Sequence, residues 1–177
     1  ELFKNAGKNY ETFESKLIES ETPVSQKLKL KSKLVYKKAT VVRQSSNVVA
    51  VVEGSDKKDE IVVFSAHYDH LGLHDGNLFA GADDDGSGVS GIMEIAQAFA
   101  MAKKKGKGPR RTLLFICFSG EEKGLLGSEY YAENPLLPMA NTVVDLNIDM
   151  IGRVDDAHLK KPNYVYVIGD DRLSSEL

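Results

Sequence analysis

The chain has 177 residues, of which 42% are hydrophobic, enough for one domain with a proper core. Its 23 basic and 26 acidic residues give a formal net charge of −3, which argues against nucleic acid as the main partner. No apolar run in the sequence is long enough to cross a membrane as a helix. The single cysteine, Cys117, excludes an internal disulfide and is predicted to be a buried, inert thiol.

The first elements are read from the spacing of apolar residues. Residues 2–18 carry apolar side chains at helical spacing and predict a helix that ends before Pro23. Residues 27–30 alternate charged and apolar side chains, which is typical of an exposed strand. Two β-rich runs, residues 47–52 and 61–66, flank a polar turn and predict a β-hairpin.

Helices and strands alternate in the rest of the chain. Residues 87–102 place their apolar side chains on one face of a helix, and residues 112–118 form a continuous apolar run typical of a buried central strand. A helix over residues 125–132 and strands over residues 143–148 and 164–168 follow. This alternation predicts an α/β fold with a largely parallel sheet.

Three of the predicted strands are followed by acidic residues or a histidine at their carboxyl ends. These residues are His67, Asp69, Glu121, Glu122 and Asp149. In open α/β sheets, ligands bind at the carboxyl ends of the strands. A chance distribution would scatter such residues over both edges of the sheet, so their placement indicates a functional site.

The stretch GADDDGSGVSGIME, residues 81–94, fits three functional patterns. A dinucleotide loop needs a strand that runs directly into the glycines, whereas here three aspartates precede them and would repel a pyrophosphate. A calcium loop needs an incoming helix, and residues 74–82 show no helical periodicity. A solvated, acid-rich helix start explains the acids of this stretch but not those at the other strand ends. A metal bridge also explains the acids at the other strand ends.

The residue types suit a two-metal hydrolytic centre. Histidine nitrogen and carboxylate oxygen are zinc ligands, and two-metal sites hold their ions roughly 3.5–4 Å apart. In the pair Glu121–Glu122, one carboxylate can bind metal while its neighbour takes a proton from water. Asp69 can accept the second ring N–H of His67 and so fix its tautomer.

Four motifs carry a resemblance to a known family: SAHYDHLG (residues 65–72), GADDDGSGVSGIMEIA (81–96), FSGEEKGLLGS (118–128) and NIDMIGR (147–153). Taken together they resemble the co-catalytic zinc aminopeptidases of peptidase family M28, such as the bacterial leucyl aminopeptidases. The resemblance implies a three-layer α/β/α zinc-exopeptidase fold with a mixed, mostly parallel central sheet.

The resemblance also implies a role for each matching residue. His67 and Asp149 would bind one zinc ion, Glu122 would bind a second, and Asp84 would bridge the two. Glu121 would be the general base, and Asp69 would be the partner of His67 behind the metal. The peptide bond between Asp84 and the next residue would be cis.

One ligand of the family pattern has no match. It is a histidine well downstream of Asp149, which we expect beyond Leu177, so this chain would hold four of the five ligands and a catalytic domain truncated at its C-terminus. We predict that His70, His74 and His158 are loop or surface histidines outside the metal site.

Two domains are predicted. Residues 1–40 form an N-terminal segment, expected to be the tail of a preceding insert or prodomain, and residues 41–177 form the incomplete peptidase domain. The expected function is hydrolysis of N-terminal residues from peptides by a secreted or periplasmic enzyme. Three alternatives stay open: a non-catalytic binding module on the same fold, a glutaminyl cyclase, and a metallo-β-lactamase-like hydrolase. The last needs a further histidine at the position of Ser65.

Overall fold

The computed structural model describes residues 1–20, 22–31 and 33–169. The chain divides into two compact units, Glu1–Val42 and Arg43–Leu177. No helix in the described part of the chain combines the length and the apolar character needed to span a membrane.

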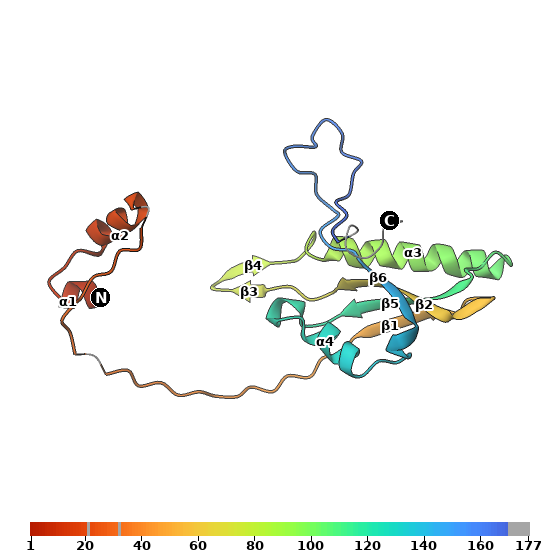
Figure 1. Cartoon of the computed structure of the whole chain (residues 1–177), viewed down its shortest axis with the longest axis horizontal. Coiled ribbons are helices and arrows are strands. Elements are labelled where there is room, and N and C mark those ends of the chain that lie inside the picture. The colour runs from red at the N-terminus through yellow and green to blue at the C-terminus, as the bar shows by residue number, and fades with distance from the viewer. Residues whose placement is uncertain (21, 32, 170–177) are drawn as a thin grey trace. The chain divides into compact units, whose positions relative to one another are not determined.

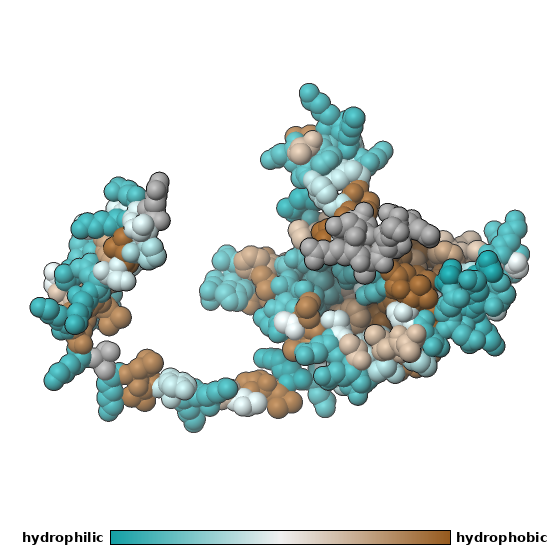
Figure 2. Space-filling model, in the orientation of Figure 1, coloured by the Kyte–Doolittle hydropathy of each residue, from teal (hydrophilic) through white to brown (hydrophobic). Residues whose placement is uncertain are grey.

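The N-terminal unit holds two short helices instead of the single helix predicted over residues 2–18. They are α1 (Leu2–Asn5) and α2 (Tyr10–Glu19). Gly7 between them has a φ of 64°, a left-handed conformation that ends the first helix. The side chain of Asn9 then caps α2 by accepting a hydrogen bond from the main-chain N–H of Thr12 at 3.0 Å. Neither helix has a buried residue, and hydrophilic side chains cover most of this unit (Figure 2).

The strand predicted over residues 27–30 is wrong. These residues belong to no strand in the structure. Lys29 has a φ of 50°, which lies in the left-handed region and is incompatible with an extended strand. An alternating pattern alone therefore did not specify a strand where no neighbouring strand supplies main-chain hydrogen bonds.

The second unit is built on a four-stranded sheet in the order β1-β5-β2-β6. The strands are β1 (Val48–Val52), β2 (Lys57–His67), β5 (Arg111–Phe118) and β6 (Thr142–Asn147). β2 is parallel to both β5 and β6, whereas β1 is antiparallel to β5. The mixed, mostly parallel sheet that was predicted is confirmed.

The predicted hairpin between β1 and β2 is wrong, because β5 lies between them. The apolar run of β5 is buried along almost its whole length. A buried strand must have both of its edges paired, so β1 and β2 each supply hydrogen bonds to one edge of β5. Closeness in sequence did not decide which strands pair.

Helices α3 (Gly86–Lys104) and α4 (Leu126–Glu133) pack on opposite faces of the sheet and make three layers (Figure 1). Side chains of β2 and β5 alternate between the faces, as the pleat of a strand requires. The buried residues on the α4 side are Ile61, Val63, Leu114, Ile116, Phe118 and Tyr131. Those on the α3 side are Val52, Ala66, Ile92, Leu113 and Phe115. The expected α/β fold and the central position of β5 are confirmed.

Two further differences from the sequence analysis concern short elements. Residues 164–168 form no strand. Strands β3 (Gly72–His74) and β4 (Asn77–Phe79) pair as a small hairpin that the sequence analysis missed. Its turn holds Asp75 and Gly76 with φ of 49° and 79°, as expected for an Asp-Gly hairpin turn. Short 3₁₀ helices occupy Glu121–Lys123 and Met139–Asn141.

Cys117 lies in β5 and packs against the core on the α3 side. It is partly buried, and no other cysteine is present. Burial, with a smaller contribution from Asp85, raises the pKa of the thiol. A raised pKa leaves little reactive thiolate near neutral pH, which agrees with the predicted inert role.

Candidate metal centre

The sheet brings the predicted site residues to one edge. His67 is the last residue of β2 and is only 3% exposed. Glu121 and Glu122 lie in the 3₁₀ helix that follows β5, and Asp149 lies just after β6. Because these three strands are parallel, their carboxyl ends meet at the same edge, as the sequence analysis anticipated.

The three consecutive aspartates before α3 have different partners. Asp83 accepts a hydrogen bond from the main-chain N–H of Gly152 at 2.8 Å. Asp85 is buried and caps α3 by accepting from the N–H of Gly88 at 2.9 Å. The carboxylate of Asp84 is left to face the histidines. The peptide bond after Asp84 is cis, as the resemblance implied.

His67 is oriented by a hydrogen bond between its Nδ1 and the main-chain carbonyl of Asp69, at 2.9 Å. A carbonyl only accepts, so Nδ1 carries the proton and Nε2 is free to bind a ligand. Nε2 lies 3.0 Å from Oδ1 of Asp84 and 4.0 Å from Oδ2 of Asp149. The ring, Asp84 and Asp149 together could hold one metal ion.

Burial, a hydrogen bond and neighbouring charges all shift the pKa of His67. Burial lowers this pKa, but the hydrogen bond to Asp69 and the charges of Asp85, Glu121 and Asp149 outweigh it, so the pKa is raised. The ring therefore takes up a proton on Nε2 more readily than an ordinary histidine does. A cation bound to Nε2 would replace that proton.

Asp69 contacts the site in a different way from the one predicted. Its carboxylate Oδ1 is 4.0 Å from Nδ1 of His67, and the main-chain carbonyl holds the ring instead. The carboxylate accepts a hydrogen bond from the N–H of Glu121 at 3.2 Å. Asp69 thus links the loop after β2 to the loop after β5, which carries the glutamate pair.

His70 was not expected in the site. Its side chain is 18% exposed, and its Nδ1 lies 2.6 Å from Oε1 of Glu122 and 3.8 Å from Oδ2 of Asp84. These three side chains form a second group that could hold a metal ion. The sequence shows only a glycine at position 81, and the structure shows why it matters: a Cβ built there would lie 2.6 Å from Cβ of His70.

The other two histidines lie outside both groups, as predicted. His74 is exposed and pairs with Asp75 at 3.4 Å. His158 bonds to Asp155 at 2.7 Å and stacks on Tyr164 within its own loop.

Asp84 is shared by the two groups, and each of its oxygens faces a different histidine. The donors are imidazole nitrogens and carboxylate oxygens, which suit zinc. Two atoms of the second group, Nδ1 of His70 and Oε1 of Glu122, are buried and have no hydrogen-bond partner among the described residues. The residues therefore fit metal binding by two adjacent groups that share Asp84.

Glu121 lies beside the first group, with Oε2 at 3.9 Å from Nε2 of His67. Burial raises the pKa of its carboxyl group, and the neighbouring carboxylates of Glu122, Asp149 and Asp84 raise it further against the opposing effect of His67. Burial likewise raises the pKa of Asp149. No hydrogen bond engages the Glu121 side chain within the described part of the chain, so this carboxylate is free to exchange a proton.

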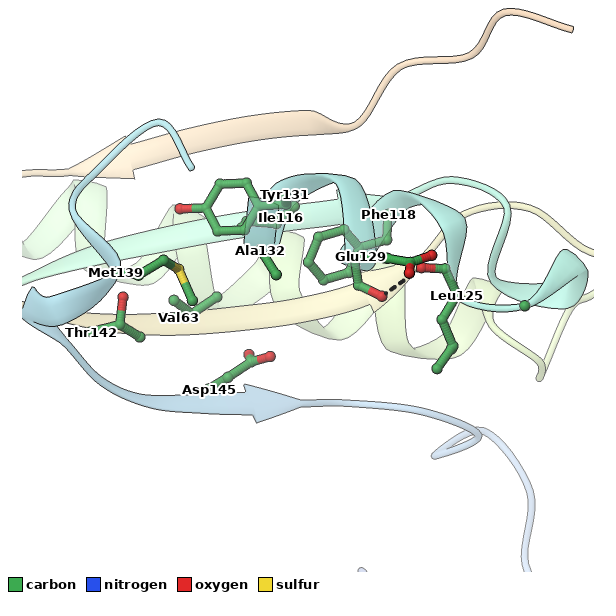
Figure 3. A pocket seen from close by; sticks show the side chains of 12 residues that line it. Val63, Ile116, Phe118, Leu125, Glu129, Tyr131, Ala132, Met139, Thr142 and Asp145 are labelled. Carbon is green, nitrogen blue, oxygen red and sulfur yellow. Dashed lines mark hydrogen bonds between the residues drawn. The ribbon is translucent and has the colours of Figure 1, made fainter. Parts of the chain in front are cut away.

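A cavity of about 200 Å³ lies next to Glu121 and is also lined by His67, Asp145 and Asp149. It shares Phe118, Leu125, Ser128 and Asp145 with a larger cavity of about 560 Å³. The larger cavity lies between α4 and β6, and most of its wall is apolar (Figure 3). A small acidic space beside the metal centre thus adjoins a larger apolar one.

Comparison with known proteins agrees with this geometry. The profile described as "Peptidase family M28" matches residues 47–174, which include every residue of both groups. The chain belongs to peptidase family M28. The α/β/α fold that the resemblance implied is therefore confirmed for this chain.

Individual proteins of other organisms also match this chain. A probable glutamate carboxypeptidase of Arabidopsis thaliana is 36% identical over 66% of this chain and 16% of its own length. A probable zinc metalloprotease of Pyricularia oryzae is 39% identical over 60% of this chain and 21% of its own. The crystal structure of a peptidase M28 precursor from Shewanella amazonensis aligns with a TM-score of 0.52 and 32% identity, over 63% of this chain and 25% of that one. The chain spans a quarter or less of each of these relatives.

Proposed function

We propose that the protein containing this chain is a zinc-dependent aminopeptidase that removes N-terminal residues from peptides. The supporting observation is the shared carboxylate of Asp84, whose two oxygens face His67 and His70 beside an unengaged Glu121. This arrangement is suited to two cations and a neighbouring base, as hydrolysis of a peptide bond requires.

The residues of the chain would divide the work. His67, Asp84, Glu122 and Asp149 would hold the zinc ions. Bound zinc would supply Lewis-acid chemistry by polarising the scissile carbonyl and lowering the pKa of water toward about 7. Glu121 would accept the proton of the attacking water and return it to the leaving amine. Its raised pKa makes the Glu121 carboxylate a stronger base than that of an ordinary glutamate.

The acidic cavity favours a substrate with a free N-terminus. Glu121, Asp145 and Asp149 line it, and no lysine or arginine is among the described residues of its wall. Asp145, which neither holds zinc nor transfers a proton in this proposal, would attract a positively charged amine. The adjoining apolar cavity supports leucine anilide as a first substrate to test.

The test is Glu121→Gln in the full-length protein. Removing the base should lower kcat by about 10²–10⁴ while zinc content stays unchanged. Glu94→Gln is the matched control, because Glu94 is exposed on α3 and makes no side-chain hydrogen bond or ion pair with a described residue. Hydrolysis of leucine p-nitroanilide and metal analysis would be measured for both variants.

Three outcomes would contradict parts of this proposal. Near-normal turnover of Glu121→Gln would disprove the assignment of the base. Stoichiometric zinc in the unaltered full-length protein without turnover of any peptide would favour a non-catalytic binding module. Equal cleavage of N-acetylated and free peptides would contradict recognition of the terminal amine.

A further inference from the structure

The second metal group contains two buried polar atoms that lie close together without forming a hydrogen bond. Nδ1 of His70 and Oε1 of Glu122 lie 2.6 Å apart, yet they do not meet in hydrogen-bond geometry. Neither atom has another hydrogen-bond partner among the described residues. Two buried polar atoms without hydrogen bonds destabilise a fold unless an ion pair or a bound cation satisfies them.

The direction of approach distinguishes a hydrogen bond from shared coordination. In a hydrogen bond the N–H points along the line to the acceptor oxygen. Two ligands of one cation instead lie side by side, and both point at the ion between them. The contact of His70 with Glu122 is close but lacks the alignment of a hydrogen bond, which is compatible with the second form. Oδ2 of Asp84, at 3.8 Å from Nδ1, completes three donors around one space.

The position of His70 is fixed by its surroundings. Gly81 packs so closely on its ring that a Cβ built at Gly81 would lie 2.6 Å from Cβ and 2.8 Å from Cγ of the histidine. The same Cβ would lie 2.7 Å from the main-chain oxygen of Asp84, which follows in the same loop. The loop that carries the bridging carboxylate therefore also holds the ring in place.

We propose that His70 binds the second zinc ion through Nδ1, together with Asp84 and Glu122. The inference rests on the proposed two-zinc function and adds one ligand to the second zinc site. Zinc accepts four ligands and sometimes five, so a further histidine from elsewhere in the protein is compatible with His70 in the same coordination shell.

The first experiment compares His70→Ala with His74→Ala in the full-length protein. His74 is an exposed histidine of the adjacent hairpin and serves as the matched control. Loss of a residue that merely supports a ligand lowers metal affinity by about 10–100-fold. Loss of a direct ligand should exceed about 100-fold for one ion and leave the other bound. Zinc content and competition titrations with a chelator would measure both affinities.

A second experiment detects the bond between the metal ion and Nδ1 of His70 directly. The protein would be loaded with ¹¹³Cd in place of zinc and labelled with ¹⁵N in the histidine ring. A scalar coupling between ¹¹³Cd and Nδ1 of His70 is expected, and it should vanish in His70→Ala but persist in His74→Ala. Circular dichroism of the metal-free variants would show that both are folded.

The outcomes separate this inference from the proposed function. If the unaltered protein binds no zinc, the proposed function fails. If it binds two ions and His70→Ala binds both with unchanged affinity, only the role of His70 is wrong. A loss below about 100-fold without cadmium coupling to His70 would also overturn the ligand assignment.

Discussion

Three aspartates that follow one another in sequence have three environments. The carboxylate of Asp83 accepts a hydrogen bond from a main-chain N–H of the loop after β6, and that of Asp85 accepts one from a main-chain N–H of α3. These bonds fix the chain on both sides of Asp84, whose carboxylate is the one directed at the histidines. The middle aspartate is thereby held in position before any ion binds, which reduces the entropy lost on binding.

At this position we expect Asp84→Ala to abolish binding of both metal ions, because it removes a donor from each group at once. Asp75→Ala is the control, since Asp75 is 89% exposed in the hairpin turn. Metal analysis after gel filtration would measure the zinc that remains. Retention of two ions by Asp84→Ala would show that Asp84 is not the bridge.

Side chains that directly follow a strand were predictable from the sequence, and those that depend on loop packing were not. The sequence placed His67, Glu121 and Asp149 at one sheet edge because each follows an apolar strand. His70 lies three residues beyond a strand end, and its position depends on contact with Gly81. Such a contact between loops has no periodic signal in the sequence.

At the scale of elements, the loop after β6 is held by its own hydrogen bonds. Asp155 accepts from the hydroxyl of Tyr166 at 2.5 Å and from the N–H of His158 at 2.9 Å. The bond from Tyr166, followed by that from His158, lowers the pKa of Asp155 to about 2. The same bond to Asp155 raises the pKa of Tyr166 to about 12.

The pH dependence of this loop follows from the two shifts. The lowered pKa of Asp155 makes its contribution to loop stability full above about pH 4 and lost as the pH falls through about 2. The raised pKa of Tyr166 makes its contribution full below about pH 10 and lost as the pH rises through about 12. We therefore expect the contact to persist between about pH 4 and 10.

The measurement is an NMR titration of the tyrosine ring carbons. Asp155→Asn should return the pKa of Tyr166 toward its ordinary value of about 10. Asp156→Asn, which changes the exposed neighbouring residue, should leave it high. A Tyr166 that titrates normally in the unaltered protein would show that the contact does not form in solution.

Elements with a long, clear period were predicted well. The apolar face of α3 and the buried run of β5 specified both elements to within a few residues. Strand partners were not predictable, because pairing depends on which edges remain free after β5 is buried. The residues at 164–168 look like a strand in composition, but they pair with no described strand, and the hydroxyls of Tyr164 and Tyr166 bond to Asp155 instead.

For the whole molecule, we expect metal to contribute directly to folding stability. An ion that binds only the folded state at 100 times its Kd stabilises it by about 2.7 kcal/mol. For a protein of this size that corresponds to roughly 5–10 °C in Tm for each ion. Calorimetry before and after chelation would measure the change. Asp84→Ala should show no such shift, and an equal shift in both proteins would contradict specific binding.

The architecture was predictable because layers, strand direction and site edge all follow from the order of elements. Parallel neighbours β5, β2 and β6 bring their carboxyl ends together whichever loops follow them. The two-unit division and the structure of Glu1–Val42 could not be inferred in the same way. That unit buries no helical residue, so its sequence carries little packing information.

The β3-β4 hairpin lies between His70 and Asp84 in the chain and is exposed along its length. Both of its ends are anchored independently, by Asp69 on one side and by a main-chain bond from Gly86 to Gly81 on the other. Doubling the length of a flexible connection adds only about 0.6 kcal/mol of closure entropy. We therefore expect that an epitope or a reporter domain inserted at the hairpin tip would leave the metal ligands in place.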